Sequence, residues 1–363
     1  MSAPWLENCW YVAALSHQIN ARHPIRLMIA GKPIVFARSA VDKSVFALAD
    51  QCPHRGAPLS QGRLVHQDIK THIECPYHGW QFAPNGQCAH IPALSAKDPA
   101  SGGHTGIATQ VYPVKEEKGL IWVFIHDEEA RRANKQSPEL APAISLPQTG
   151  IPGKWKPSSH TILDTQGPFM EAVTGLVDPA HTPYVHKQWW WRSGRLPQEK
   201  TKNYQKLPFG FRIPFHQPSS NSRIYSFFGG VPKTQIDFLI PSLRVETVEL
   251  GTKKIIGLTA ITPIKPGINR IFHLLYWDLW QLTMMRPIVS AMALSFLSQD
   301  AKILHVQAMN LGAESDKSIL LGEPDMPAIW LHQLTSAWQN QIKGPSPDGF
   351  NNPIKTSDLN WRT

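Results

Sequence analysis

Two short motifs in the first third of the chain each pair a cysteine with a histidine. They are Cys52-Pro53-His54 and Cys75-Pro76-Tyr77-His78. Each offers one thiolate and one imidazole, and two irons joined by sulfides can take two Cys on one iron and two His on the other. Glycine follows each motif within a short distance, so we expect two facing loops that approach the metal closely. The spacing predicts a [2Fe–2S] cluster held by Cys52, His54, Cys75 and His78.

A structural zinc site of the Cys2His2 type is the alternative, because it uses the same residue types. The C-x-H spacing is one residue shorter than the usual zinc knuckle, and both motifs lie among predicted strands, without the helix of a zinc finger. The cluster is therefore favoured. Cys9 and Cys88 have no partner at ligand spacing and are expected to be buried small side chains.

A second set of metal-binding residue types lies downstream, in the segment that runs from Asp178 to His186 with the sequence DPAHTPYVH. On an unbroken helix, His181 and His186 would diverge by about 140°. Pro183 disfavours helical backbone at the residue before it, so the helix carrying Asp178 and His181 is expected to end there and let His186 turn back. Two His and one carboxylate make the facial set of a non-haem Fe(II) site, with open positions for O2 and substrate.

Asp300 is the candidate third ligand. Residues 288–309 follow Pro287, which suits the first turn of a helix, and they carry helical apolar spacing. The residues three and four positions from Asp300 are apolar, which places its carboxylate on the buried face, where a metal offsets the cost of burial. An exposed or salt-bridged Asp is the alternative, and Asp164 and Glu171 are weaker rivals as ligands.

The elements that must position these residues divide the chain into two parts. Strand-like runs occupy residues 26–29, 34–37, 45–49 and 120–125 in the first part, with Gly31-Lys32-Pro33 as one of the breakers. A polar, proline-rich stretch between Asp127 and Trp155 reads as a linker. Further strands are predicted at residues 223–228, 235–240, 243–250, 254–262 and 270–277, as an antiparallel meander before the long helix. We therefore predict an all-β domain at 1–130, a linker at 131–155 and an α+β domain at 156–363.

Composition narrows the function classes. The 363 residues include 42% hydrophobic and 17% charged residues, which is typical of a globular protein with a sizeable core. The first 15 residues lack a basic n-region, and Arg286 and Pro287 interrupt the most apolar stretch, so we expect a cytoplasmic protein without a membrane span. The net charge of +9 is compatible with an acidic protein partner, an anionic membrane surface or nucleic acid. Nucleic acid is the weakest of the three, because the chain has no basic run interleaved with aromatic residues.

Three separated segments in order resemble the Rieske non-haem iron oxygenases: CPHRGAPLSQG with CPYHGWQF, then DPAHTPYVH, then SQDAKIL. The length and the opening WYVAAL are similar to the oxygenase (alpha-type) components of the shorter single-subunit members, such as vanillate O-demethylase and dicamba monooxygenase. The resemblance implies an α+β protein with an all-β Rieske domain, then a helix-grip catalytic domain of antiparallel sheet and long C-terminal helix, assembled as a homotrimer. It also implies that His181, His186 and Asp300 bind Fe(II), and that Asp178 links His181 to the cluster ligand His78 of a neighbouring subunit.

The function that this resemblance implies is that of a mono- or dioxygenase. Electrons from NAD(P)H would arrive through a separate reductase or ferredoxin, because the chain has no G-x-G-x-x-G motif of its own. The iron would activate O2 to hydroxylate or oxidatively demethylate an apolar, aromatic small molecule. A Rieske-type electron-transfer or iron-binding protein without oxygenase activity is the alternative, for which the second metal set is not needed.

Two further features bear on that site. Many family members have Asn three residues before the bridging Asp, where this chain has Gly175, so a supporting contact is absent or supplied elsewhere. Several large apolar side chains near the iron ligands could line a substrate pocket, although core packing is the favoured role for most of them. They are Trp189, Trp190, Trp191, Trp280, Met284, Met285 and Met292.

Overall fold

The computed structural model describes residues 4–67, 70–95, 97–98, 104–127, 144–186, 199–217, 231–311, 319–342 and 350–362. The chain folds as two compact units, one within residues 8–145 and the other made of residues 1–7 and most of 146–363. The predicted strand at 223–228, the Trp189–Trp191 run and much of the predicted linker lie outside the described residues. The exact bounds of the two domains and the linker stay predictions.

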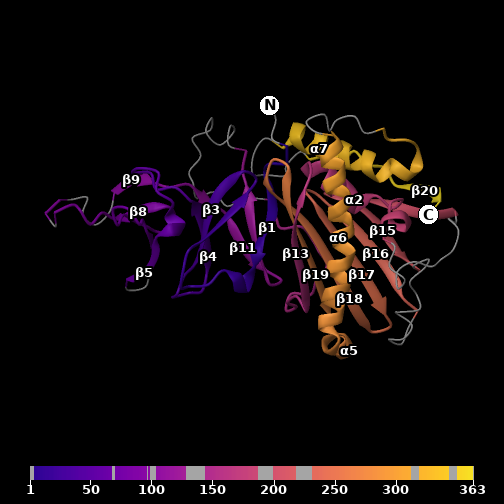
Figure 1. Ribbon diagram of the computed structural model, residues 1–363, viewed down its shortest axis with the longest axis horizontal. Coiled ribbons are helices and arrows are strands. Elements are labelled where there is room, and N and C mark those ends of the chain that lie inside the picture. The colour runs from indigo at the N-terminus through magenta and orange to yellow at the C-terminus, as the bar shows by residue number, and fades with distance from the viewer. Residues whose placement is uncertain are drawn as a thin grey trace. The chain divides into compact units, whose positions relative to one another are not determined.

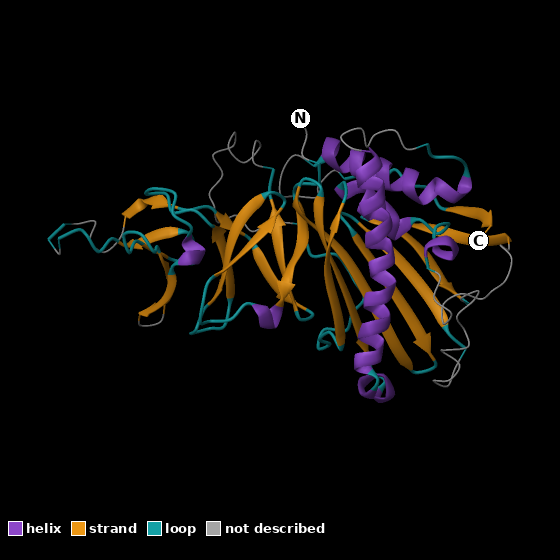
Figure 2. Ribbon diagram, in the orientation of Figure 1, coloured by secondary structure: helices purple, strands orange, loops and turns teal. Residues whose placement is uncertain are grey.

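The first unit is all-β, as the sequence predicts. Its strands form sheets of three, four and five strands, in the orders β1-β12-β11, β10-β4-β3-β2 and β5-β6-β7-β8-β9. They are β1 Cys9–Leu15, β2 Ile25–Ile29, β3 Lys32–Arg38, β4 Val45–Ala49, β5 Arg63–Gln67, β6 Lys70–Glu74, β7 Gln81–Phe82, β8 Gln87–His90, β9 His104–Ala108, β10 Val111–Tyr112, β11 Val114–Glu117 and β12 Leu120–Ile125. Figure 2 shows the strands of this unit in orange.

One breaker in this unit is shorter than predicted. The sequence indicated a break over Gly31-Lys32-Pro33, but β3 already begins at Lys32. The turn consists of Ala30 and Gly31, and both have positive φ. Two residues with positive φ make the tight hairpin turn whose twist matches that of the flanking strands, so pairing resumes at once.

The second unit is an eight-stranded antiparallel sheet in the order β13-β19-β18-β17-β16-β15-β14-β20. Figure 1 shows the long helix α6 lying over the face of this sheet. The strands are β13 Ser159–Gln166, β14 Glu199–Leu207, β15 Gly210–His216, β16 Lys233–Leu239, β17 Leu243–Leu250, β18 Lys253–Lys265, β19 Ile268–Trp277 and β20 Ser357–Arg362. The helices are α2 Phe169–Val177, α3 Thr182–Val185, α5 Trp280–Met284, α6 Arg286–Leu311 and α7 Met326–Gln341.

The predicted meander and long helix are confirmed, since β16 to β19 pair in sequence order and α6 begins at Arg286, with Pro287 in its first turn. The helix α7 and the edge strand β20 were not predicted. The apolar spacing of α6 predicts a wider buried face than the structure has. Ile303, for example, is apolar but 43% exposed. None of the helices in the described part of the chain is both long and apolar enough to cross a membrane.

Candidate functional site

The two Cys/His motifs of the first unit form loops with the same backbone hydrogen bonds. In the first loop, Cys52 N–H donates to Ala57 O (2.8 Å) and Gly56 N–H donates to Cys52 O (2.8 Å). In the second loop, Cys75 N–H donates to Trp80 O (2.8 Å), and Gly79 N–H donates to Cys75 O (3.1 Å). The glycine is four residues after the cysteine in both loops, so the loops match although the motifs read C-x-H and C-x-x-H.

Both glycines have positive φ, +75° at Gly56 and +72° at Gly79, which glycine adopts without steric cost. This conformation turns each loop back, so that its cysteine and histidine lie on the same side. The rings of His54 and His78 have their centroids 4.6 Å apart. The structure thus brings together the two imidazoles that the sequence assigned to one iron.

The cysteines of these loops are buried, and the histidines are half-buried. Trp80 stacks on the His54 ring with centroids 4.5 Å apart and holds its orientation. Burial, with a smaller contribution from the neighbouring Cys75, raises the pKa of the Cys52 thiol to about 11. Burial, His54 and Arg55 lower the pKa of His78, which favours the neutral imidazole. Two adjacent buried thiols suit a cationic centre that holds them as thiolates, so the donor set fits a cluster.

The helix break in the second set differs from the prediction. The sequence indicated a helix carrying Asp178 and His181 that ends near Pro183. Instead α2 ends at Val177, and Asp178 is its extended C-cap residue, because Pro179 disfavours helical backbone at the residue before it. Pro183 lies in the first turn of the short helix α3, a position that suits proline. The short helix α3 separates His181 from His186 and brings the two side chains together. The chain does not turn back within α2, as the sequence had indicated.

Three side chains from two elements meet at one point in this unit. His186 Nε2 lies 3.2 Å from Asp300 Oδ1, and His181 Nε2 lies 3.8 Å from the same oxygen. One ligand atom from each of the three residues lies within 4.8 Å of the others. His186 is 1% exposed, and the Asp300 side chain is 28% exposed. Asp300 thus lies beside the two imidazoles but is half-buried rather than buried. Its rival Asp164 instead forms an ion pair with Arg270 (2.7 Å).

The other nitrogen of each imidazole has its own partner. His186 Nδ1–H donates to Gln299 Oε1 (3.2 Å), and the ring stacks on Phe296 with centroids 3.5 Å apart. His181 Nδ1 lies 3.3 Å from Asp178 Oδ2, as an ion pair rather than an aligned hydrogen bond. Asp178 also accepts a hydrogen bond from the backbone N–H of Ala180 (2.7 Å). Such partners fix the ring orientation that leaves Nε2 free to bind a metal.

The surroundings shift the pKa values of the three residues in different directions. Burial lowers the pKa of His186 to about 4, so this imidazole is neutral at pH 7. Burial raises the pKa of Asp300 to about 6. Burial lowers the pKa of His181, but the carboxylates of Asp178 and Asp300 outweigh burial and leave that pKa above its usual value. A buried carboxylate beside two imidazoles suits a divalent cation, which would bind their unprotonated forms.

Sequence reasoning missed Gln299 and placed several apolar residues wrongly. Gln299 directly precedes Asp300 on α6. Nothing in the sequence distinguishes a glutamine at this position from an ordinary surface residue of the helix. Trp280 and Met284 are 68% and 75% exposed, so they neither line a closed pocket nor pack in the core. Met292 is half-buried on α6.

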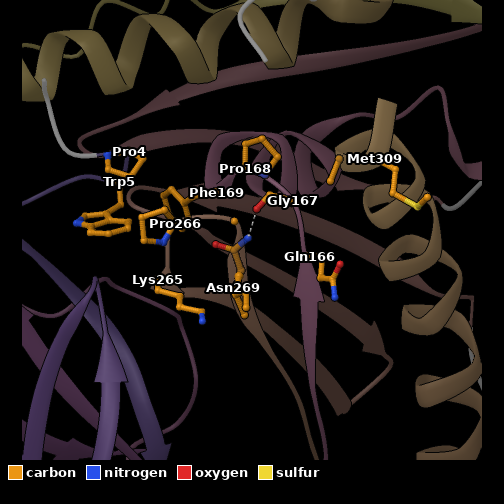
Figure 3. Close-up of a pocket in the computed structure, with 13 residues that line it drawn as sticks. Pro4, Trp5, Gln166, Gly167, Pro168, Phe169, Lys265, Pro266, Asn269 and Met309 are labelled. Carbon is orange, nitrogen blue, oxygen red and sulfur yellow. Dashed lines mark hydrogen bonds between the residues drawn. The ribbon is translucent and has the colours of Figure 1, made fainter. Parts of the chain in front are cut away.

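A cavity of this unit lies away from His181, His186 and Asp300. It has a volume of about 590 Å³ and is lined by Trp5, Phe169, Lys265 and Met309, among others (Figure 3). Its floor is held by a hydrogen bond from the Asn269 side chain to Gly167 O (2.9 Å). Met309 is nine residues beyond Asp300 on α6, or roughly 13 Å along the helix axis. The cavity contains none of the predicted site residues.

Comparison with known proteins supports a Rieske domain in the first unit. Residues 9–113 match the Rieske [2Fe-2S] domain family. The chain is 34% identical over 188 residues to the oxygenase component of dicamba O-demethylase from Stenotrophomonas maltophilia, over 50% of this chain and 48% of that protein. It is 28% identical to the oxygenase component of chloroacetanilide N-alkylformylase from Rhizorhabdus wittichii, over 50% of this chain and 47% of that protein. The chain thus matches about half the length of these curated relatives.

Solved structures extend the likeness to nearly the whole fold. A crystal structure of dicamba monooxygenase bound to dicamba has a TM-score of 0.65 at 23% identity and covers 92% of this chain and 98% of its own. The terminal oxygenase of carbazole 1,9a-dioxygenase from Nocardioides aromaticivorans has a TM-score of 0.69 at 20% identity, over 94% and 97% of the two chains.

The class of protein follows from these findings. The chain contains a Rieske domain, which implies a [2Fe–2S] cluster, followed by the fold of the solved Rieske oxygenases. The resemblance that the motifs carry is therefore confirmed in the Rieske domain and in the overall fold. The roles of the individual ligands stay predictions, for which the geometry above is the support.

Proposed function

We propose that this chain is the oxygenase component of a multi-component Rieske system. It takes single electrons from NAD(P)H through a separate reductase or ferredoxin and activates O2 at a mononuclear Fe(II). The substrate is an apolar, aromatic small molecule, which is hydroxylated or oxidatively demethylated. The convergence of His181, His186 and Asp300 carries this proposal, because a protein that only transfers electrons has no need of a second, open metal site.

The residues of the chain have separate roles in this proposal. Cys52, His54, Cys75 and His78 hold the cluster, which supplies electrons one at a time when bound. Gln299 and Asp178 orient the imidazoles of His186 and His181, and Phe296 shields His186 from water. Three protein ligands leave coordination positions for O2.

We further propose a homotrimer in which Asp178 links His181 to the cluster ligand His78 of the neighbouring subunit. Asp178 suits this role because its backbone lies at the end of α2 and its carboxylate is held by the Ala180 N–H beside His181. Burial raises the pKa of Asp178, but His181 and Ala180 lower it more, so the group is a carboxylate at pH 7. The location in the cytoplasm stays a prediction of the sequence.

The test replaces the candidate third ligand. Asp300→Ala removes the only carboxylate of the set, so we expect loss of the mononuclear iron and of product formation, with the visible spectrum of the cluster unchanged. Asp164→Ala is the matched control, because Asp164 is paired with Arg270 and should leave both iron and activity in place. Iron assay, visible absorption and O2 uptake with a competent reductase measure the outcome.

Methoxylated aromatics, N-methyl compounds and plain arenes, each with product analysis, distinguish demethylation from ring hydroxylation. An Asp300→Ala protein that keeps its iron and its turnover contradicts the proposal. A wild-type protein that reduces its cluster but never couples O2 uptake to a product supports the electron-transfer alternative instead.

A further inference from the structure

The short helix α5 and the start of α6 carry a group of exposed apolar side chains. Figure 1 shows α5 at the lower end of α6, where the chain leaves β19 and turns into the long helix. Four large side chains of this turn are between 39% and 75% exposed, namely Trp280, Met284, Met285 and Ile288. We call these four residues the apolar tip. Single exposed apolar residues are common on proteins, whereas a group of them marks an interaction surface.

The opposite side of the same turn is fixed to the sheet. Leu279 and Leu282 are buried in an apolar cluster with Leu250 of β17 and Trp277 of β19. The indole Nε1–H of Trp277 also donates a hydrogen bond to Thr283 Oγ1 (2.9 Å). These contacts decide which side of the turn faces outward, so exposure of the apolar tip is a property of the folded unit.

A basic turn lies beside the apolar tip. Lys253 and Lys254 open β18, and both are exposed. The backbone N–H of Lys254 donates to the carboxylate of Asp278 (2.8 Å), in the link between β19 and α5, so the turn is joined to the residues that lead into the tip. Lys254 also forms an ion pair with Glu249 (2.8 Å). Lys253 forms no ion pair with any described residue, so its charge is available to a partner.

Further positive charge lies at the same end of the sheet. Arg286 is the first residue of α6 and is exposed. Lys154 and Lys156 are exposed as well and precede β13. The backbone N–H of Ser158 donates to Leu275 O near the end of β19 (2.8 Å). The segment with these two lysines therefore meets the sheet at the end from which α5 emerges.

The charge balance and the size of the surface indicate what it binds. Residues 152–158, 249–256 and 278–288 together carry five basic side chains and two carboxylates. Excess positive charge beside exposed apolar groups is complementary to an anionic bilayer, and tryptophan suits the boundary between lipid and water. A stable protein interface buries about 800 Å² on each partner, whereas the tip has four large side chains on one turn. A lipid surface therefore fits better than a second copy of the chain.

We propose that the apolar tip inserts into the surface of an anionic phospholipid bilayer, with the neighbouring lysines and Arg286 against the lipid headgroups. The protein is then bound at the membrane surface by one end of the second unit. This inference goes beyond the proposed oxygenase function and does not depend on it, because insertion of the tip requires neither mononuclear iron nor turnover.

The test measures co-sedimentation of the purified, metal-loaded protein with vesicles. One set is phosphatidylcholine alone, and the other contains phosphatidylglycerol as well. We expect binding to the anionic vesicles to be tighter by about tenfold or more, because several basic groups lie near the tip, and to weaken as salt is added. The double variant Trp280→Ser with Met284→Ser should lower binding to the anionic vesicles by about tenfold or more, since it removes the inserted apolar surface.

Matched controls come from the same long helix. Met309 is 71% exposed at the other end of α6, close to the 75% of Met284, so Met309→Ser should leave vesicle binding unchanged. Arg286→Gln should weaken binding to the anionic vesicles by a few fold, whereas Lys302→Gln, at an exposed lysine in the middle of α6, should not. Circular dichroism and the visible spectrum of the cluster verify that each variant is folded.

A second measurement locates the inserted group. Trp280 is the one exposed tryptophan within the described ranges. Vesicles with brominated acyl chains should quench part of the tryptophan fluorescence of the wild-type protein. Trp280→Leu keeps an apolar side chain, so this variant should still bind the vesicles within a few fold but lose most of the quenching.

The inference is overturned if the wild-type protein binds neither kind of vesicle, or if the Trp280→Ser, Met284→Ser protein binds as well as the wild type. Equal loss of binding in Met309→Ser or Lys302→Gln also overturns it, because attraction to lipid is then not specific to the tip. Light scattering on the same samples gives the number of subunits. A change in that number in the double variant would show that the tip is instead a contact between copies of the chain.

Discussion

The two donor sets of this protein are built in opposite ways. The Cys/His set comes from two loops with one backbone pattern, each defined within a few residues of its cysteine. The His/His/Asp set joins the short segment after α2 to a helix far away in the sequence. In the proposed function, the first set would enclose a cluster with its four ligands, whereas the second would leave coordination positions open. Local repetition suits electron storage, and convergence of distant elements suits a site that must admit O2 and substrate.

The two donor sets also differ in how deeply their side chains are buried. In the first set the cysteines are buried and the histidines are half-buried, so one edge of the set faces outward. In the second set His186 is the buried member and is covered by Phe296, while His181 and Asp300 are about one quarter exposed. The first arrangement leaves an edge from which electrons can enter or leave. The second excludes water from one ligand and keeps an open side.

The largest expected effect comes from breaking the first set. Cys75→Ser replaces a thiolate ligand with a hydroxyl, which does not suit a cluster iron. We expect complete loss of the visible cluster spectrum and of activity, while the mononuclear iron is kept because its ligands lie in the other unit. Visible absorption with iron and sulfide assays measures this outcome. Cys9→Ala, at a buried cysteine in β1, should keep the colour. Equal loss of all iron would show that the two sets are not independent.

The next effect tests the link between the sets. Asp178→Asn keeps the shape of the side chain and removes its charge, so both metal sites should remain loaded. We expect the rate of cluster oxidation on mixing with O2 and substrate to fall by about 10- to 100-fold, the usual scale for a partner of a ligating His. Stopped-flow absorbance follows that step directly. Glu171→Gln, in the first turn of α2, is the control. An unchanged rate would leave Asp178 as a helix cap only.

A smaller effect is expected at Gln299, which acts on one set alone. Gln299→Leu removes the acceptor of the His186 Nδ1–H and leaves a buried donor without a partner. We expect iron affinity of the mononuclear site to fall by about tenfold, with the cluster spectrum unchanged. Competition with a chelator measures the affinity, and Gln307→Leu on the exposed side of the same helix is the control. Affinity equal to that of the wild-type protein would contradict a positioning role.

The comparison also explains how far the sequence could be interpreted. The ligands Cys52 and His54 were predicted because a short loop needs only local spacing, and Asp300 was predicted because helical periodicity is local as well. The end of α2 was misplaced because two prolines compete within five residues, and Pro179 rather than Pro183 decides it. The neighbour Gln299 was missed because its contact with His186 depends on the fold. Strand register in particular joins residues far apart in the sequence, which spacing does not encode.

The smallest expected effects are changes in stability on replacing two glycines, one within a helix and one with positive φ. Gly175 lies within α2, where family members often have Asn, and a Cβ built there meets nothing within 4 Å. Gly175→Ala should therefore raise the stability of the second unit by up to ~1 kcal/mol, because alanine has the higher helix propensity. Gly56 has positive φ, so Gly56→Ala should instead destabilise its loop by roughly 1–2 kcal/mol. Urea unfolding, followed separately for the two units, measures both changes. A destabilised Gly175→Ala protein would mean that the space beside α2 is occupied in the assembled protein.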